Sequence, residues 1–455
     1  MNHELWAKLS EYNFDDPMSE YGFSTRLANE NFWTKDFTEK AIVEYKKFMY
    51  LAATSDLMVS PSEIIDVVWH QHLIFTQSYT EFCNIIGKTI QHVPSTHNKE
   101  EAEKFKLAKE RTIRFYKENF GEQAKEIWEY SDMYESLELV KAKIKIRTFI
   151  NLGVLAFIIL IVPFYFLLRP VYVQFDNPYF IITYISIAVL TVFILEIYNR
   201  QYLSRISNNF KEFTFIRHLK PLELVYLKTQ MLSDVIHGTM NQLVHENKIL
   251  INHDHTISKT NMGRPNSLEQ WQVMEELDYF KAVYYPTLMR SLLLKPVFWN
   301  TANCMNALKK YFIKSKTFGL LFYLNFGILA ILLMLGFIRF STGLIRDKPV
   351  TQLFFVLVFS VVIIIAYLWR LTKMFCTISI PELYKNEILP SRRDANDWEW
   401  RYFLTGPAVL AASFLPMVNY VNKNDKNSAG GGCGSSGGSS CGSSCSGCGG
   451  CGGGD

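Results

Sequence analysis

The chain has 455 residues, of which 49% are hydrophobic and 20% charged, so its length leaves room for several domains. The 47 basic and 43 acidic residues give a net charge of only +4, which does not indicate a nucleic-acid-binding protein.

Residues 1–135 are expected to form a soluble all-α domain. Ser60-Pro61-Ser62-Glu63 is a capping box with proline at the first helical position, and Asn98 with Glu101 repeats the capping pattern. The helix that follows should stop near Phe120-Gly121, where glycine permits a left-handed cap. Strand-like alternation is not evident in this part of the sequence.

The densest group of reactive side chains lies in residues 62–83. His70, His72 and Cys83 occur there and His92 follows shortly after. Neutral imidazole and thiolate are good ligands for zinc or a related divalent ion, so these four residues are the candidate metal ligands. On a continuous helix, positions two apart point about 200° apart, so His70 and His72 share a metal only if the helix breaks or ends between them.

A structural role is the alternative for the same stretch. Trp69, His72 and Tyr79 could line a core, with their polar atoms bonded to Asp66 or to backbone. The sequence provides no group that would orient a catalytic pair of Cys83 and a histidine.

A longer pattern runs through residues 23–128. Its residues are Asp66, Val68-Trp69-His70-Gln71-His72-Leu73, Tyr79, Cys83, Gly87, His92, Phe115-Tyr116, Phe120-Gly121 and Ile127-Trp128. This pattern resembles the domain shared by glycine-rich domain-containing proteins, which is found in plants and in bacterial membrane proteins. The resemblance implies an α-helical domain of no established activity.

Four apolar runs have the length that a helix needs to cross a bilayer. They are expected to form two transmembrane hairpins, and basic residues flank the outer ends of each hairpin while the short connections are nearly neutral or only modestly basic. By the positive-inside rule, the N-terminus, the middle segment and the stretch after the fourth run face the cytoplasm of a bacterial inner membrane or another plasma membrane. The runs are residues 148–168, 178–198, 317–336 and 350–369.

Between the hairpins, residues 201–316 are expected to form a small winged-helix-like and helical domain. Residues 221–227 and 233–246 are predicted helices, and residues 249–251 and 255–257 are predicted strands around a turn. The second helix carries no basic ridge, so a protein-binding or structural role is favoured over nucleic acid binding.

The middle domain contains the stretch LKPLELVYL at residues 219–227, followed by a helix that ends in a Leu-Val pair and by a short strand. With these features, the chain from about residue 206 to the C-terminus resembles a family of uncharacterised bacterial multi-pass membrane proteins that close in a tail of glycine and cysteine. In the stretch 371–427, the short run 403–418 contains two prolines and is interpreted as interfacial or re-entrant, with a fifth crossing as the alternative.

Residues 428–455 consist mainly of glycine, serine and cysteine and lack aliphatic or aromatic side chains beyond one alanine. Such a segment cannot bury a core, so we expect a disordered tail. A flexible tether, metal capture by Cys-x-x-Cys pairs and post-translational cyclisation of Cys and Ser remain open for it. The tail thiols are Cys433, Cys441, Cys445, Cys448 and Cys451.

The expected fold is therefore mainly α, with a linker helix and the first hairpin in residues 136–200 and the second hairpin in residues 317–370. We expect a non-enzymatic multi-pass membrane protein that binds a protein partner and presents its tail. The alternatives are a metal-dependent enzyme or redox protein that uses the four candidate ligands, and a precursor whose tail is modified.

Overall fold

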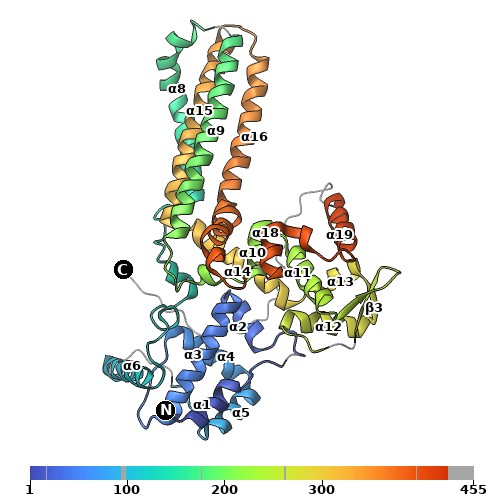
Figure 1. The fold of residues 1–455 in the computed structure, drawn as a ribbon. Helices are drawn as coiled ribbons and strands as arrows, with labels where there is room; N and C mark the ends of the chain where they lie inside the picture. Colours follow the sequence, from blue (N-terminus) through green and yellow to red (C-terminus); the bar gives the residue numbers. More distant parts are fainter. Residues whose placement is uncertain (17, 94–98, 176, 261–262, 396, 429–455) are drawn as a thin grey trace.

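The computed structural model describes all residues except 17, 94–98, 176, 261–262, 396 and 429–455. A long bundle of four helices stands on a broad helical body in which the N-terminal domain lies beside the middle domain (Figure 1). The tail cysteines lie outside the described residues.

The N-terminal domain is all-α, as predicted. Its central helix α3 buries Tyr45, Phe48 and Met49 against α4 and the surrounding helices. The domain consists of α1 (His3–Glu11), α2 (Phe23–Asn31), α3 (Lys35–Thr54), α4 (Glu63–Ile74), α5 (Thr76–Ile86), α6 (Lys99–Phe120), α7 (Lys125–Trp128) and a 3-10 turn at Met133–Leu137.

Helix α4 begins two residues later than the capping box predicted. Ser62, rather than Ser60, is the N-cap, and its hydroxyl accepts a hydrogen bond from the Ile65 amide at 3.2 Å. The Ser60 amide instead donates to the Thr112 hydroxyl at 2.9 Å, which ties this loop to α6. Gly121 follows α6 with a φ of 84°, which is the left-handed conformation predicted for the end of this helix. Asn98, which was predicted to cap the start of the helix, lies outside the described residues.

Four helices are long and apolar enough to cross a membrane. Three of them extend beyond the predicted runs at both ends, whereas α16 begins one residue later than predicted and extends beyond its run only at the C-terminal end. They are α8 (Ile146–Tyr172), α9 (Asn177–Asn208), α15 (Lys316–Ile345) and α16 (Thr351–Met374). In α15, 44% of the most apolar window is buried inside the protein, against 0 to 17% in the other three helices. Helix α15 is therefore the one that the others surround.

Polar side chains join three of these helices inside the bundle. The amides of Asn199 on α9 and Asn325 on α15 donate to each other at 2.9 and 2.8 Å, and Asn199 also donates to the Tyr367 hydroxyl on α16 at 2.9 Å. Near the same end, Glu196 accepts two hydrogen bonds from the Arg370 guanidinium at 2.7 and 2.8 Å. Hydrogen bonds between apolar helices fix which faces meet, because the surrounding apolar side chains offer these polar groups no other partner.

The middle domain contains the predicted pair of helices and the predicted hairpin. Its sheet is antiparallel in the order β1-β2-β3, and Leu250 faces Ser258 while Ile257 faces Val283. The elements are α10 (Pro221–Thr229), α11 (Leu232–His245), β1 (Ile249–Ile251), β2 (Thr256–Lys259), α12 (Leu268–Phe280), β3 (Ala282–Tyr284), α13 (Tyr285–Leu292) and α14 (Pro296–Ile313).

The stretch after α16 differs from the expected interfacial or re-entrant segment. Phe414 and Val418 are fully buried in the soluble body, and the Phe414 ring packs edge-on against Tyr285. These apolar side chains fill the core of the middle domain. The segment contains π-helical turns at Phe375–Ser379 and Tyr384–Ile388, α17 (Ile380–Leu383), 3-10 turns at Leu389–Ser391 and Gly406–Val409, α18 (Trp398–Thr405) and α19 (Leu415–Ser428).

The N-terminal and middle domains share one continuous core. Tyr134 donates a hydrogen bond to the Phe32 carbonyl at 2.7 Å and lies against Cys304 of α14. The Lys35 ammonium pairs with Glu269 of α12 at 3.0 Å. The two domains and the stretch after α16 therefore lie together at one end of the bundle (Figure 1).

Candidate metal centre

Three potential metal ligands come together on the surface of the N-terminal domain. Asp66 and His70 are one helical turn apart on α4, so their side chains share one face of that helix. His92 lies in the connection that follows α5. Its Nε2 is 2.8 Å from Asp66 Oδ1, and His70 Nδ1 is 3.2 Å from Asp66 Oδ2.

The ligand atoms of these three residues all lie within 4.8 Å of one another. Two imidazole nitrogens and one carboxylate oxygen form a donor set that suits zinc and similar divalent ions. The His70 side chain is 56% exposed, whereas the His92 side chain is 16% exposed, so solvent reaches the cluster from the His70 side. Three protein ligands with one open side leave a coordination position for water.

Trp69 and Tyr79 hold the segment that carries His92. The Tyr79 hydroxyl donates to the Ile90 carbonyl and accepts a hydrogen bond from the Trp69 indole nitrogen at 3.3 Å. Burial raises the pKa of Tyr79 to about 12, so its hydroxyl remains a donor at neutral pH. The Trp69 ring also packs against the His92 ring, with centroids 4.7 Å apart.

His72 and Cys83 do not join this cluster. His72 is fully buried, its Nδ1 lies 2.9 Å from the Tyr45 hydroxyl, and its Nε2 lies 3.2 Å from the Ser78 hydroxyl. Burial lowers the pKa of His72 to about 4. Cys83 is also buried in the core, and among the described cysteines none forms a disulfide with it.

The four candidate ligands therefore separate into two pairs. His70 and His92 meet at the surface, while His72 and Cys83 belong to the core, as the structural alternative expected for His72. Helix α4 ends only after both His70 and His72, so they stay on opposite sides of it. The third ligand is Asp66, which was not predicted as a ligand although its four-residue spacing from His70 is visible in the sequence.

A second concave site lies between the N-terminal and middle domains. This inter-domain cleft has a volume of about 740 Å³ and is lined by side chains of both charges. At its base, the Glu223 carboxylate accepts hydrogen bonds from the Lys220 and Lys35 amides at 2.7 and 3.1 Å. Burial raises the pKa of Glu223 to about 7. The charged residues of the lining are Asp15, Lys35, Glu39, Lys46, Lys220, Glu223, Glu269 and Glu399.

Comparison with known protein families matches most of the N-terminal domain. The model of the UCP032817-like family matches residues 14–118, a stretch that includes the three clustered ligands. No curated protein matches the chain, and no solved structure does.

Proposed function

We propose that this chain is a multi-pass membrane protein whose N-terminal domain binds a divalent transition metal ion, such as zinc, through Asp66, His70 and His92. The observation that carries the proposal is the convergence of the three ligand atoms within 4.8 Å of one another. A bound ion would take the place of the contacts between Asp66 and the two imidazoles. Any proton shared in these contacts would be released when the ion binds.

Metal binding is expected to hold two parts of the domain together. Asp66 and His70 belong to α4, whereas His92 belongs to the connection between α5 and α6. One ion would fix that connection against α4. Cys83 plays no part in this proposal because its thiol lies in the core, away from the cluster.

The test is a titration of the purified full chain with Zn²⁺ and with Co²⁺. The five tail cysteines are replaced by serine, because thiolates would otherwise bind either ion. We expect one ion per chain, and a Co²⁺ spectrum without a thiolate charge-transfer band. His70→Ala or His92→Ala should each weaken binding by about a hundredfold or more, because two ligands remain.

The matched control is His245→Ala, which removes an exposed histidine from α11 in the other domain. It should leave affinity and stoichiometry unchanged. Substoichiometric binding by the parent chain, or equal affinity in the His70, His92 and His245 variants, would show that the cluster is only a set of hydrogen bonds.

A second function, binding of a protein partner, is supported by the inter-domain cleft. Its mixed charges and its open volume of about 740 Å³ suit a polar segment that carries both signs of charge. In this proposal the protein is a scaffold at the inner face of a plasma membrane, with its N-terminus in the cytoplasm and its glycine, serine and cysteine tail presented to a partner. The likeness of the N-terminal motif to glycine-rich domain-containing proteins is part of the same proposal.

A photo-crosslinking amino acid in the cleft tests partner binding in cells. Val43 lines the cleft and is 45% exposed, whereas Val140 is 68% exposed and lies outside it. We expect a discrete protein adduct from position 43 and none of the same mass from position 140. Identical adduct patterns from the two positions would contradict a partner site in the cleft.

A further inference from the structure

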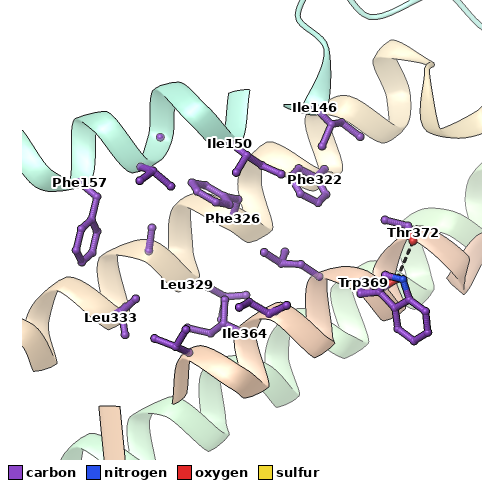
Figure 2. Close-up of a pocket in the computed structure, with 16 residues that line it drawn as sticks. Ile146, Ile150, Phe157, Phe322, Phe326, Leu329, Leu333, Ile364, Trp369 and Thr372 are labelled. Carbon is purple, nitrogen blue, oxygen red and sulfur yellow. Dashed lines mark hydrogen bonds between the residues drawn. The ribbon is translucent and has the colours of Figure 1, made fainter. Parts of the chain in front are cut away.

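A lateral groove runs along the helix bundle. Helix α8 forms one wall and α16 the other, and α15 lies between these two helices (Figure 2). It has a volume of about 610 Å³, which is within the range of about 300–1,000 Å³ typical of small-molecule sites. Phe157 of α8, Phe326 and Leu333 of α15 and Ile364 of α16 project into it (Figure 2). Its lining is almost entirely apolar, and the Thr372 hydroxyl at one end donates to the Trp369 carbonyl at 2.7 Å.

The groove opens sideways, toward the surface that meets lipid if the four helices cross a bilayer. Val154 on one wall is 50% exposed, and Ile365 and Trp369 on the other wall are each 63% exposed. An apolar concavity with exposed apolar walls has no favourable contact with water, whereas hydrocarbon chains fit it. The groove therefore suits a chain of methylene groups better than a polar solute.

The length of the groove corresponds to one leaflet. Its lining runs from Ile146 to Phe157 on α8 and from Val361 to Thr372 on α16. Each stretch is roughly 16 Å long at the rise of an α-helix. That is about half of the roughly 30 Å hydrocarbon thickness of a bilayer.

One end of the groove is basic. Ile146 and Thr372 lie at the end next to the soluble body, and Lys145, Arg147 and Lys373 are their neighbours in the chain. The Lys373 ammonium lies 3.4 Å above the centre of the Trp369 ring, a lining residue. Within the described part of the chain, no carboxylate forms an ion pair with these three cations, unlike Arg370, which pairs with Glu196.

We propose that the lateral groove holds an acyl chain of one anionic phospholipid from the leaflet next to the soluble body, with the lipid phosphate against Lys145, Arg147 and Lys373. The shape of the groove selects a chain of one-leaflet length, and the cations select the headgroup. The proposal depends on the four helices crossing the bilayer and is independent of the metal centre.

Native mass spectrometry of the purified full chain tests the proposal. Phosphatidylglycerol and phosphatidylcholine with identical acyl chains are titrated separately. We expect one tightly retained lipid, with phosphatidylglycerol binding about tenfold more tightly because of the three cations. Replacing all three with alanine should abolish that preference, whereas Arg346→Ala with Lys348→Ala, at the other end of α15, should preserve it.

Adjacent positions on α16 provide the matched pair for the groove itself. Val361 lines the groove, whereas Val362 is 58% exposed and does not. Val361→Trp should weaken phosphatidylglycerol binding at least fivefold, and Val362→Trp should leave it unchanged. Ile365→Trp, compared with Ile363→Trp, repeats the test if Val361→Trp is not monodisperse, because Ile363 is 43% exposed and also lies outside the groove.

Three results would overturn the proposal. Equal affinity for the two lipids would identify ordinary annular lipid, and equal retention by the Val361 and Val362 variants would place the lipid elsewhere. A dimer found in place of the lipid complex would show that a second copy of the chain covers the groove, if Val361→Trp abolishes that dimer.

Discussion

Acidification from about pH 7.5 to about pH 4.5 is expected to remove most of about 3 kcal/mol of stability from the N-terminal domain through His72 alone. His72 is fully buried, and its surroundings lower its pKa to about 4 from an ordinary value of 6.5. Between these two values the unfolded chain binds a proton at this position and the folded chain does not. The stabilisation is therefore complete above about pH 6.5 and is lost as the pH falls toward 4.

None of the groups in contact with His72 described below would neutralise a positive charge on its imidazole. Its two nitrogens face the hydroxyls of Tyr45 and Ser78, and the rings of Phe14 and Tyr79 pack against it. Burial raises the pKa of Tyr45 well above its usual value, and that of Tyr79 to about 12, so both remain neutral in the acid range. A protonated His72 would be a buried cation without a counter-ion.

Hydrogen exchange of the α3 and α4 amides in the full chain, corrected for the intrinsic pH dependence of exchange, measures this loss. His72→Gln keeps hydrogen-bonding groups but does not titrate, so it should lower stability at neutral pH and flatten the acid dependence. The α11 amides are the internal control, because His237 gives the middle domain its own buried histidine with a pKa of about 4. An acid dependence of α3 and α4 that is the same in parent and variant would contradict the prediction.

The elements that depend on local pattern were predictable from the sequence. The four helices that are long and apolar enough to cross a membrane follow from uninterrupted apolar runs. The helix pair with its hairpin follows from periodicity and turn residues. Ser267 caps α12 by accepting a hydrogen bond from the Gln270 amide at 3.3 Å, a contact between residues three apart in the chain. These features require only neighbours along the chain.

The features that were missed depend on contacts between distant segments. Phe414 and Val418 belong to an apolar run that suits either a bilayer interface or a protein core, and only the position of α11 and α13 decides between them. Helical periodicity correctly placed His70 and His72 on opposite sides of α4. Which of them faces the core, and the approach of His92 to Asp66, follows from the packing of α3 and α5.

Glu44 also makes contacts between segments that are distant in the chain. This residue is buried on α3, and its Oε2 accepts hydrogen bonds from the Tyr116 hydroxyl at 2.8 Å and the Trp128 indole nitrogen at 2.7 Å. Its Oε1 accepts from the Lys47 ammonium at 2.7 Å. One carboxylate therefore joins α3 to α6 and α7.

Glu44→Ala is expected to destabilise the N-terminal domain by about 3–4 kcal/mol, because two buried donors and one cation lose their acceptor together. In hydrogen exchange of the full chain, amides of α3, α6 and α7 should exchange more than about a hundredfold faster. Glu44→Gln retains one oxygen for Tyr116 and Trp128 but turns an amide toward Lys47, so its effect should be roughly half as large in free energy.

The control for Glu44 is Glu4→Ala, which breaks an exposed ion pair with Lys8 on α1 and should leave exchange in α3, α6 and α7 unchanged. If Glu44→Ala behaves like this surface control, the carboxylate does not hold the three helices together. If Glu44→Gln is as damaging as Glu44→Ala, the ion pair with Lys47, rather than the bonds from Tyr116 and Trp128, dominates. Because Trp128 belongs to α7, which is next in the chain to the turn that contacts the middle domain, loosening in Glu44→Ala should also extend to Met133–Leu137.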